Sequence, residues 1–325
     1  MDKENGGKSD ALNAGINFSS YPLFACLDAD SRIEPDALLK LSTEFLKNTD
    51  TIVAGGLVRI ANGFKIRDGR VSGFSMPPKM VEKFQIVEYY RSFLSGRVSW
   101  GATNSMLIVS GAFGVFNKQA VIEVGGYKTN TIGEDMEIVV RLHKYMRAHR
   151  RKYKIIFCED SVCWTQGPMS VTDIRSQRRR WQVGLLDTLI SHRSMFLNPR
   201  YGMIGLLAIP YNWIFELFGA VVEVLGYFII PFSLVMGELN MFFFVMYFLL
   251  AVLLGVILSI GSLILEQYTR KTTMTAKQSL SLSLYAVLEN FGYRQMITLF
   301  RVEGILKYRK LRKTWGKIKR KEVEQ

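Results

Sequence analysis

Cysteine is scarce in this chain of 325 residues, which has only Cys26, Cys158 and Cys163. An odd number without metal-ligand spacing excludes a disulfide framework and fits a reducing compartment. We expect the three thiols to be small, buried side chains. The first 15 residues are polar and rich in glycine, so they do not have the apolar core of a signal peptide. The sequence also lacks internal repeats and low-complexity tracts.

Acidic residues are in the minority, because 28 Asp and Glu stand against 42 Lys and Arg, a formal net charge of +14. Such an excess often indicates a nucleic-acid partner. Here, however, 49% of the residues are hydrophobic and the basic residues cluster beside apolar runs. That distribution is typical of cytoplasmic flanks that face anionic lipid. We therefore expect a lipid bilayer as partner, and no nucleic acid.

Two long segments are almost free of charge. Tyr211–Met236 contains no Lys or Arg, and Met241–Leu265 is 25 residues without any charged side chain. Each is longer than the roughly 20 apolar residues that span a bilayer. The pattern predicts two membrane helices joined by a tight turn at Gly237–Asn240. The basic stretch Glu266–Gln278 that follows predicts a cytoplasmic position.

The segment Ser279–Leu306 is apolar in part but carries Glu289, Arg294 and Arg301. The tail Lys307–Lys321 after it holds nine Lys or Arg. With basic flanks on both sides, the segment is expected to lie in the membrane interface or to be a re-entrant element, not a third span.

Glu216 and Glu223 interrupt the first apolar run, seven residues apart on one helix face. Carboxylates at such depth are costly and usually face protein or a water-filled path. We expect them to line a polar route beside the active site or to pair with a partner helix. For Glu216, a position near the headgroups fits equally well because Pro210 can mark the membrane edge.

The first 200 residues alternate between strand-like and helix-like patterns. The predicted strands are Tyr21–Leu27, Thr51–Ile60, Met106–Phe116 and Lys154–Cys158. The predicted helices begin near Glu34–Asp36 and cover Val81–Leu94 and Met136–Met146. This alternation predicts an α/β domain with a largely parallel sheet.

An acidic pair, Asp28 and Asp30, follows the first predicted strand. About one Asp-x-Asp tripeptide is expected by chance in a chain of this length, and taken alone the pair is better explained as a solvated turn with helix-capping aspartates. At the crevice edge of an α/β sheet, however, two carboxylates can hold a divalent cation whose other ligands are substrate phosphates.

Two further signals follow in order. Glu134 and Asp135 come where a helix begins, and the positive helix end keeps Asp135 ionised as a proton acceptor or simply complements its charge. Gln177-Arg-Arg-Arg180-Trp181 is a rarer combination. Its arginines can neutralise a departing diphosphate, and its indole offers a flat face for a sugar ring. A membrane-surface helix with basic anchors is the alternative.

Five segments occur together and in order: Lys8-Ser-Asp-Ala-Leu-Asn13-Ala-Gly15, Asp28-Ala-Asp30, Ser110-Gly-Ala-Phe-Gly114, Gly133-Glu-Asp135 and Gln177-Arg-Arg-Arg180-Trp181. The combination resembles the membrane-bound, processive branch of glycosyltransferase family 2, which includes cellulose, chitin-oligosaccharide, hyaluronan and poly-N-acetylglucosamine synthases. The resemblance covers essentially the whole chain. It implies an α/β nucleotide-diphospho-sugar transferase domain of GT-A type followed by transmembrane helices.

The resemblance also implies roles for residues on the donor side. Lys8 and Asn13 would contact the nucleotide side of a nucleotide sugar, with UDP-sugars as the first expectation. Asp28 and Arg180 would touch its diphosphate. Asp30 would bind Mg²⁺ or Mn²⁺.

On the acceptor side, Ser110 and Gly111 would form part of the pocket around the donor sugar and the acceptor end. Gln177 and Trp181 would hold the acceptor sugar, and Asp135 would be the base that deprotonates its hydroxyl group. The family inverts the anomeric carbon by direct displacement, so the expected activity is that of an inverting hexosyltransferase that extends a β-linked polysaccharide.

The implied organisation is a cytoplasmic catalytic domain over residues 1–200, two transmembrane helices over 201–265, and an interfacial helix with a basic tail over 266–325. The implied location is the cytoplasmic membrane, with accessory export subunits as a further class of partner. Two departures stand out. Gly133 occupies a position that is more often Thr, and roughly a hundred residues that precede Lys8 in the family have no counterpart here.

Those residues carry the first strands of the sheet and an Asp that pairs with the nucleotide base. The sequence therefore predicts an N-terminally truncated catalytic domain that binds donor weakly alone. The alternative to an active enzyme is a catalytically incompetent membrane fragment that needs the missing part.

Overall fold

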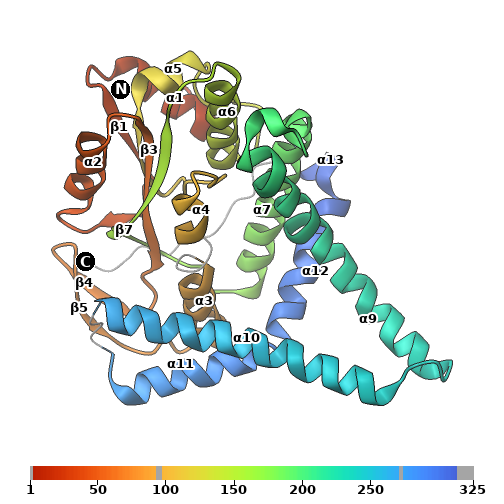
Figure 1. Ribbon diagram of the computed structural model, residues 1–325. Coiled ribbons are helices and arrows are strands. Elements are labelled where there is room, and N and C mark those ends of the chain that lie inside the picture. The colour runs from red at the N-terminus through yellow and green to blue at the C-terminus, as the bar shows by residue number, and fades with distance from the viewer. Residues whose placement is uncertain (1–2, 93–96, 271–273, 313–325) are drawn as a thin grey trace.

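The computed structural model describes residues 3–92, 97–270 and 274–312 (Figure 1). A five-stranded sheet with the order β1-β6-β3-β7-β2 forms its centre. The strands are β1 Leu23–Leu27, β2 Arg32–Ile33, β3 Thr51–Ile60, β6 Phe113–Asn117 and β7 Lys154–Thr165. A separate hairpin pairs β4 Phe64–Arg67 with β5 Arg70–Phe74. The prediction of an α/β domain followed by apolar helices is confirmed.

The sheet is mixed, so the prediction of a largely parallel sheet is wrong. Only β3 and β7 pair in parallel, whereas β6 is antiparallel to both β1 and β3, and β2 is antiparallel to β7. The reason lies in the turn before β6. Phe113 opposes Leu27, the last residue of β1, so β6 starts at the edge where β1 ends. The predicted strand Met106–Phe116 is thereby shortened to β6.

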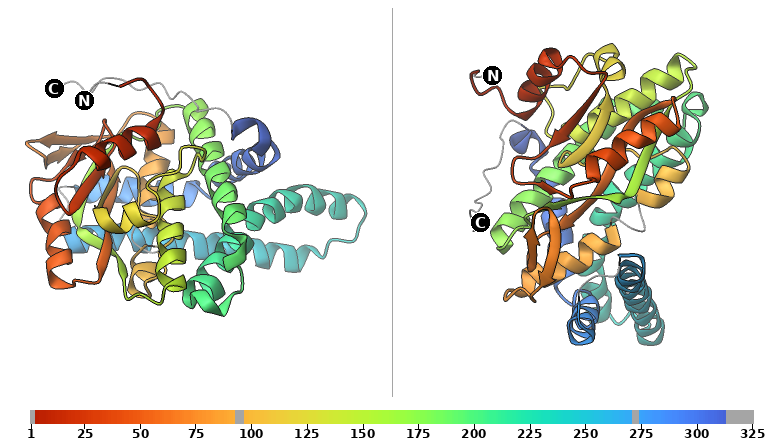
Figure 2. Two further views of the ribbon diagram at one scale, coloured as in Figure 1. Left: turned by 90° about the horizontal axis from the view of Figure 1, so that it is seen from above. Right: turned by 90° about the vertical axis from the view of Figure 1, so that its left-hand side faces the viewer.

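Helices cover both faces of the sheet (Figures 1 and 2). They are α1 Lys8–Phe18, α2 Ala37–Lys47, α3 Met80–Arg91, α4 Val98–Ala102, α5 Lys118–Glu123, α6 Glu134–Ala148 and α7 Val171–Ser191. Leu41 of α2 is buried in one core cluster with Ala54 and Val58, and Ile138 of α6 in another with Val53. β3 is buried along its whole length, which fits its mostly apolar sequence.

Beyond α7 the chain is almost entirely helical. The elements are η2 Arg193–Met195, η3 Pro199–Tyr201, η4 Ile204–Ala208, α8 Ile209–Tyr211, η5 Asn212–Phe218, α9 Gly219–Val235, α10 Met241–Arg270, α11 Ala276–Leu288, α12 Tyr293–Leu306 and α13 Tyr308–Leu311. Figure 1 shows α9 and α10 meeting at a tip far from the sheet, with α12 lying between α9 and the sheet domain.

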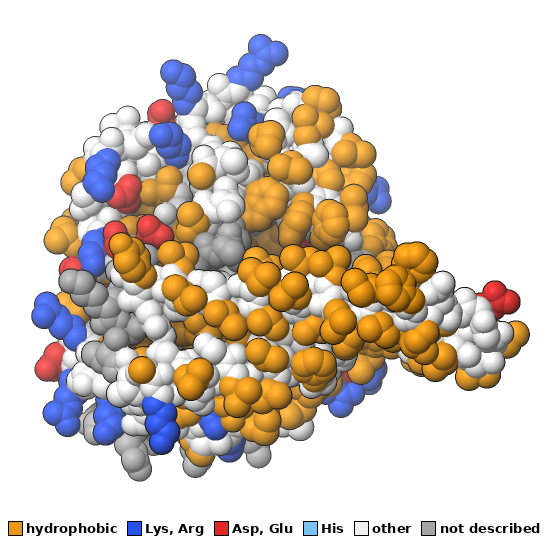
Figure 3. Space-filling model, turned by 60° about the horizontal axis from the view of Figure 1, so that its bottom comes forward, with side chains coloured by type: hydrophobic (Ala, Val, Ile, Leu, Met, Phe, Trp, Pro, Cys, Tyr) orange, Lys and Arg blue, Asp and Glu red, His pale blue; other side chains and the backbone are white. Residues whose placement is uncertain are grey.

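Two helical stretches, Ile204–Val235 and Met241–Tyr268, are long and apolar enough to cross a membrane. Only 6% of the apolar window in each is buried, so they are not core helices of a soluble domain. Figure 3 shows their apolar side chains as a continuous band along the arm that α9 and α10 form as they project from the sheet domain. An exposed apolar surface of this kind indicates membrane association.

The segment Ser279–Leu306 is not one element but two helices, since the backbone breaks at Gly292, whose φ is 103°. α11 packs against α3 and α10, and α12 packs against α7 and α9. Arg301 of α12 lies 3.0 Å from Glu216 Oε2, which confirms that Glu216 pairs with a partner helix. The position of α11 and α12 relative to a bilayer stays a prediction.

Buried polar contacts attach α10 to the sheet domain. Arg59 of β3 forms an ion pair with Glu266, and both side chains are almost fully buried. Arg91 of α3 donates a hydrogen bond of 2.7 Å to Ser259. A buried charge is costly without its partner, so the end of α10 nearest the sheet is held in one place on the domain.

Candidate active site

Lys8 joins three segments that the sequence analysis singled out. Its Nζ lies 2.6 Å from Asp28 Oδ1 and 3.3 Å from Glu134 Oε1. It also donates to the carbonyl oxygen of Gly111 at 3.3 Å. The first residue of α1, the end of β1, the turn before β6 and the start of α6 therefore meet at one point.

Burial and neighbouring charges set the protonation of this cluster. Burial alone would lower the pKa of Lys8, but the charges of Asp28 and Glu134 outweigh it and raise that pKa above its ordinary value. Burial, and then the charge of Asp135, raise the pKa of Glu134 although Lys8 opposes them. Lys8 is therefore positively charged, in the centre of a cluster whose other charged groups are carboxylates.

Asp135 lies in the first turn of α6, as predicted. Its Oδ1 accepts a hydrogen bond of 2.9 Å from the N–H of Met136, and its Oδ2 accepts one of 3.3 Å from the N–H of Gly111. The carboxylate therefore lies at the positive end of the helix dipole. Each oxygen keeps a further lone pair, so Asp135 can still accept a proton.

Ser110 and Gly111 form a tight turn beside this carboxylate. Phe113 N–H donates to the carbonyl of Ser110 at 3.0 Å, and Ala112 N–H to its hydroxyl oxygen at 3.3 Å. A Cβ atom at position 111 would lie 2.8 Å from Lys8 Nζ and 3.5 Å from the Cβ of Asp135. Glycine thus allows the turn to fit between the cation and the carboxylate.

Asp28 and Asp30 follow β1, and their carboxylate oxygens are the kind of donor that a hard divalent cation takes. In the described part of the chain, no group of three or more His, Cys, Asp or Glu could hold a metal. Mg²⁺ is commonly held by one or two carboxylates together with substrate phosphates, so the pair fits such a cation. Cys163 lies nearby, and burial raises the pKa of its thiol to about 12.

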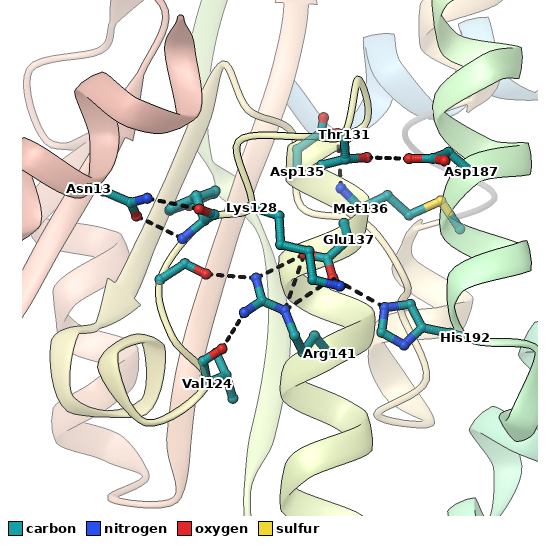
Figure 4. A network of polar contacts seen from close by, with 12 residues as sticks. Asn13, Val124, Lys128, Thr131, Asp135, Met136, Glu137, Arg141, Asp187 and His192 are labelled. Carbon is teal, nitrogen blue, oxygen red and sulfur yellow. Dashed lines mark hydrogen bonds and ion pairs between the residues drawn. The ribbon is translucent and has the colours of Figure 1, made fainter. Parts of the chain in front are cut away.

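Asn13 makes contacts that the sequence did not reveal. Its Nδ2 donates to the carbonyl of Tyr127 at 2.8 Å, and its Oδ1 accepts from the N–H of Tyr127 at 2.7 Å (Figure 4). Both amide ends hold the loop before α6, and Asn13 and Tyr127 line a polar pocket of about 510 Å³. A donor-binding role for Asn13 stays a prediction.

Glu137, two residues after Asp135, organises the same loop (Figure 4). Its carboxylate lies 2.8 Å from Lys128 Nζ, 2.8 Å from Arg141 Nη2 and 3.2 Å from His192 Nε2. Burial would raise the pKa of Glu137, but hydrogen bonds from His192 and Arg141 hold it at about 2. Because Arg141 also donates to two loop carbonyls, this network fixes the first turn of α6.

The Gln177–Trp181 motif lies on α7. Gln177 and Arg178 are buried, whereas Trp181 is 44% exposed. The guanidinium carbon of Arg178 lies 4.4 Å from the centre of the Trp181 ring. Gln177 Oε1 is buried and accepts no hydrogen bond from the residues that the structure describes. The exposed side of the indole is the kind of flat apolar surface on which a sugar ring can stack.

Two residues that sequence reasoning missed connect Asp135 with this motif. Arg97 is half-buried, and desolvation of its guanidinium lowers its pKa to about 10 although the charge of Asp135 opposes the shift. The charge of Arg97 also acts on the hydroxyl of Tyr89, as do the charges of Arg178 and Arg180 in the motif. Arg97 therefore adds a second positive charge that interacts electrostatically with Asp135. No motif of the sequence marks it, since it stands alone in its segment.

The unusual Gly133 has a structural explanation. A Cβ atom on Gly133 would lie 2.9 Å from the Cα of Gly184 in α7, and a Cβ on Gly184 would lie 2.9 Å from the Cα of Gly133. The backbones at the start of α6 and the middle of α7 touch, so a threonine at position 133 does not fit. This contact sets the spacing between Asp135 and the Gln177–Trp181 motif.

We expect Gly184→Ala to destabilise the protein by about 1–3 kcal/mol, because the added methyl group meets backbone that cannot rotate away. Transfer activity should fall as well, since α6 and α7 separate. Thermal unfolding in detergent measures the first effect. Gly226→Ala is the control: that helical glycine has nothing within 4 Å, so alanine should stabilise by about 0.5–1 kcal/mol. Equal shifts for both variants would contradict the close contact.

The chain belongs to Glycosyl transferase family group 2, whose sequence model matches residues 23–260. It is 30% identical over 188 residues to the poly-beta-1,6-N-acetyl-D-glucosamine synthase of Staphylococcus aureus (strain COL), a match that covers 58% of this chain and 41% of that protein. The synthase of the same name from Staphylococcus epidermidis is 30% identical over 186 residues, 57% of this chain and 40% of that protein.

The matched stretch thus spans about two fifths of the length of these curated relatives. Among solved structures, a mannosyltransferase from Pyrobaculum calidifontis in complex with GDP-Man and Mn²⁺ aligns with a TM-score of 0.48 and 14% identity. That alignment covers 93% of this chain and 66% of the other. The likeness is too weak to carry an argument about substrate or metal.

Proposed function

We propose that this chain carries the catalytic centre of an inverting glycosyltransferase that adds sugars from a nucleotide-diphosphate sugar to a growing β-linked polysaccharide at a membrane. The observation that supports this most is the placement of Asp135. Its carboxylate lies at a helix start, beside Gly111 and within range of Lys8 and Arg97. A carboxylate base with positive charges nearby suits a reaction in which a hydroxyl loses its proton while a diphosphate leaves.

In this proposal Asp135 accepts the proton of the acceptor hydroxyl, whose oxygen forms the new bond to the anomeric carbon. The bond from that carbon to the diphosphate breaks on the opposite side, so an α-linked donor gives a β-linked product. Arg180 and Lys8 balance the negative charge that the leaving diphosphate gains. Gln177 and Trp181 hold the acceptor sugar, and Ser110 and Gly111 form part of the pocket beside it.

Asp30, with Asp28 beside it, would hold Mg²⁺ or Mn²⁺ against the donor diphosphate. Such a cation supplies positive charge to the phosphate oxygens. The remaining binding comes from the protein. Asp28 is already held by Lys8 at 2.6 Å, so Asp30 is the carboxylate proposed as the metal ligand.

The membrane arrangement is part of the proposal. The domain over residues 1–200 would be cytoplasmic, the helices over 201–265 would make the chain multi-pass, and the segment 266–325 would return to the cytoplasmic surface. The basic residues Arg270, Lys271 and Lys277, at the C-terminal end of α10 and after it, support this orientation. The growing glycan is the proposed acceptor, and accessory export subunits are proposed partners.

The test incubates membranes that contain the protein with a panel of labelled nucleotide sugars in the presence of Mg²⁺ or Mn²⁺. UDP-N-acetylglucosamine leads the panel, because the relatives named above are poly-N-acetylglucosamine synthases. The expected result is a β-linked polymer that is absent from membranes carrying Asp135→Asn. Hydrolysis of every donor without transfer to any glycan would contradict the proposed function.

A further inference from the structure

Three helices meet around the carboxylate of Glu88 on α3. Its Oε2 accepts a hydrogen bond of 2.9 Å from Arg178 Nη2 of α7, and another of 2.9 Å from the hydroxyl of Tyr293 at the start of α12. The Arg178 side chain is 8% exposed and that of Glu88 is 13% exposed. The ion pair is therefore largely removed from water, where a charge-assisted hydrogen bond is strong and directional.

Arg178 transmits this contact to Trp181. Its guanidinium lies 4.4 Å from the centre of the indole ring, a distance typical of a cation–π contact. The indole is nevertheless 44% exposed, so one side is supported by the protein and the rest remains open to a ligand. The hydrogen bond to Glu88 fixes the orientation of the Arg178 guanidinium, and the guanidinium in turn fixes the orientation of the Trp181 ring that stacks on it.

Tyr293 is itself immobilised. Its ring stacks on Phe84 of α3 with 4.7 Å between centroids and 23° between planes, and its side chain is buried. Helix α12 follows the apolar helices α9 and α10 along the chain. Through Tyr293 it contacts Glu88, which holds Arg178 beneath Trp181. Neither Glu88 nor Tyr293 faces the Lys8–Asp135 cluster through any described hydrogen bond or ion pair, so their effect on the site passes through Arg178.

We propose that Glu88 and Tyr293 are positioning residues that hold Arg178 beneath Trp181 and so set the plane on which the acceptor sugar stacks. The inference rests on the proposed function only in naming the ligand of Trp181 as a sugar. The residues act on acceptor binding and leave donor binding unchanged. The helices beyond the membrane segment thereby take part in selecting the acceptor end of the glycan.

The test compares wild-type protein with Glu88→Gln and Tyr293→Phe, the second of which keeps the ring on Phe84. For both we expect the KM for a soluble oligosaccharide of the product to rise about tenfold, the size expected for one charge-assisted hydrogen bond, with kcat changed less than about threefold. The affinity for the nucleotide sugar should not change. Acrylamide quenching of Trp181, isolated by subtracting the same protein with Trp181→Phe, should increase.

Glu303→Gln is the matched control. Glu303 also joins α12 to α7, through Arg175 at 2.7 Å and Arg179 at 3.1 Å, but has no contact with Trp181. An equal rise of the acceptor KM in Glu303→Gln would show that only helix packing matters and would overturn the inference. Unchanged quenching of Trp181 in Glu88→Gln and Tyr293→Phe would also overturn the inference. Quenching needs no activity, so it remains decisive if the proposed transfer reaction is absent.

Discussion

Replacing Asp135 by asparagine should reduce sugar transfer at least about a hundredfold while donor binding survives, because the substitution keeps the shape of the side chain but removes the base. The amide oxygen can still accept a hydrogen bond from Met136 or Gly111. Single-turnover transfer to an oligosaccharide measures the loss, and equilibrium binding of the nucleotide sugar measures the donor affinity.

Asp173→Asn is the control for this variant, since Asp173 also lies in the first turn of a helix, α7, and accepts a hydrogen bond from Ser170. It should lower stability slightly through the helix dipole and leave transfer near normal. A collapse of donor affinity in Asp135→Asn would instead assign Asp135 to the nucleotide site, and the role as base would be wrong.

Removing the carboxylate of Asp30 should abolish detectable transfer. Asp30→Ala takes away the proposed metal ligand at the end of β1, and the diphosphate then loses the charge that the cation supplies. The loss should not be restored by raising the Mn²⁺ concentration. Donor-dependent Mn²⁺ binding, followed by electron paramagnetic resonance, should disappear together with activity.

Asp36→Ala provides the comparison, because Asp36 is an exposed carboxylate close in sequence whose partner is Lys40. Its removal should change neither Mn²⁺ binding nor transfer. Normal turnover of Asp30→Ala with Mg²⁺ or Mn²⁺ would rule out the metal role, and retained Mn²⁺ binding without turnover would point to Asp28 as the ligand.

The sequence predicts single elements of this fold well where a local pattern is unambiguous. β3 has the predicted bounds, Thr51–Ile60, because its apolar run is buried on both faces and ends at turn residues. The start of α6 at Glu134 follows from its acidic first turn. The direction of β6 could not be predicted, since it depends on which sheet edge the Ser110–Gly111 turn occupies.

The residues of the candidate site likewise fall into those that the sequence could predict and those that it could not. Lys8, Asp28 and Asp135 belong to recognisable segments, and the structure brings them together. The supports of the site have no local signal. Arg178 reaches a partner 90 residues away, and Glu88 meets Tyr293 across 205 residues, so periodicity and spacing cannot reveal them. Gly184 is likewise explained only by the backbone that it touches.

The separation of Glu88 and Tyr293 also orders events during synthesis. A ribosome adds about 5–20 residues per second, so roughly 10–40 s pass between the appearance of Glu88 and that of Tyr293. Both apolar helices emerge in that interval, before α12 can dock on α7. In a nascent chain, Arg178 beneath Trp181 is therefore held by Glu88 alone until the helices α9 and α10 have left the ribosome. The acceptor surface gains its second support, Tyr293, only after these apolar helices have had time to reach lipid.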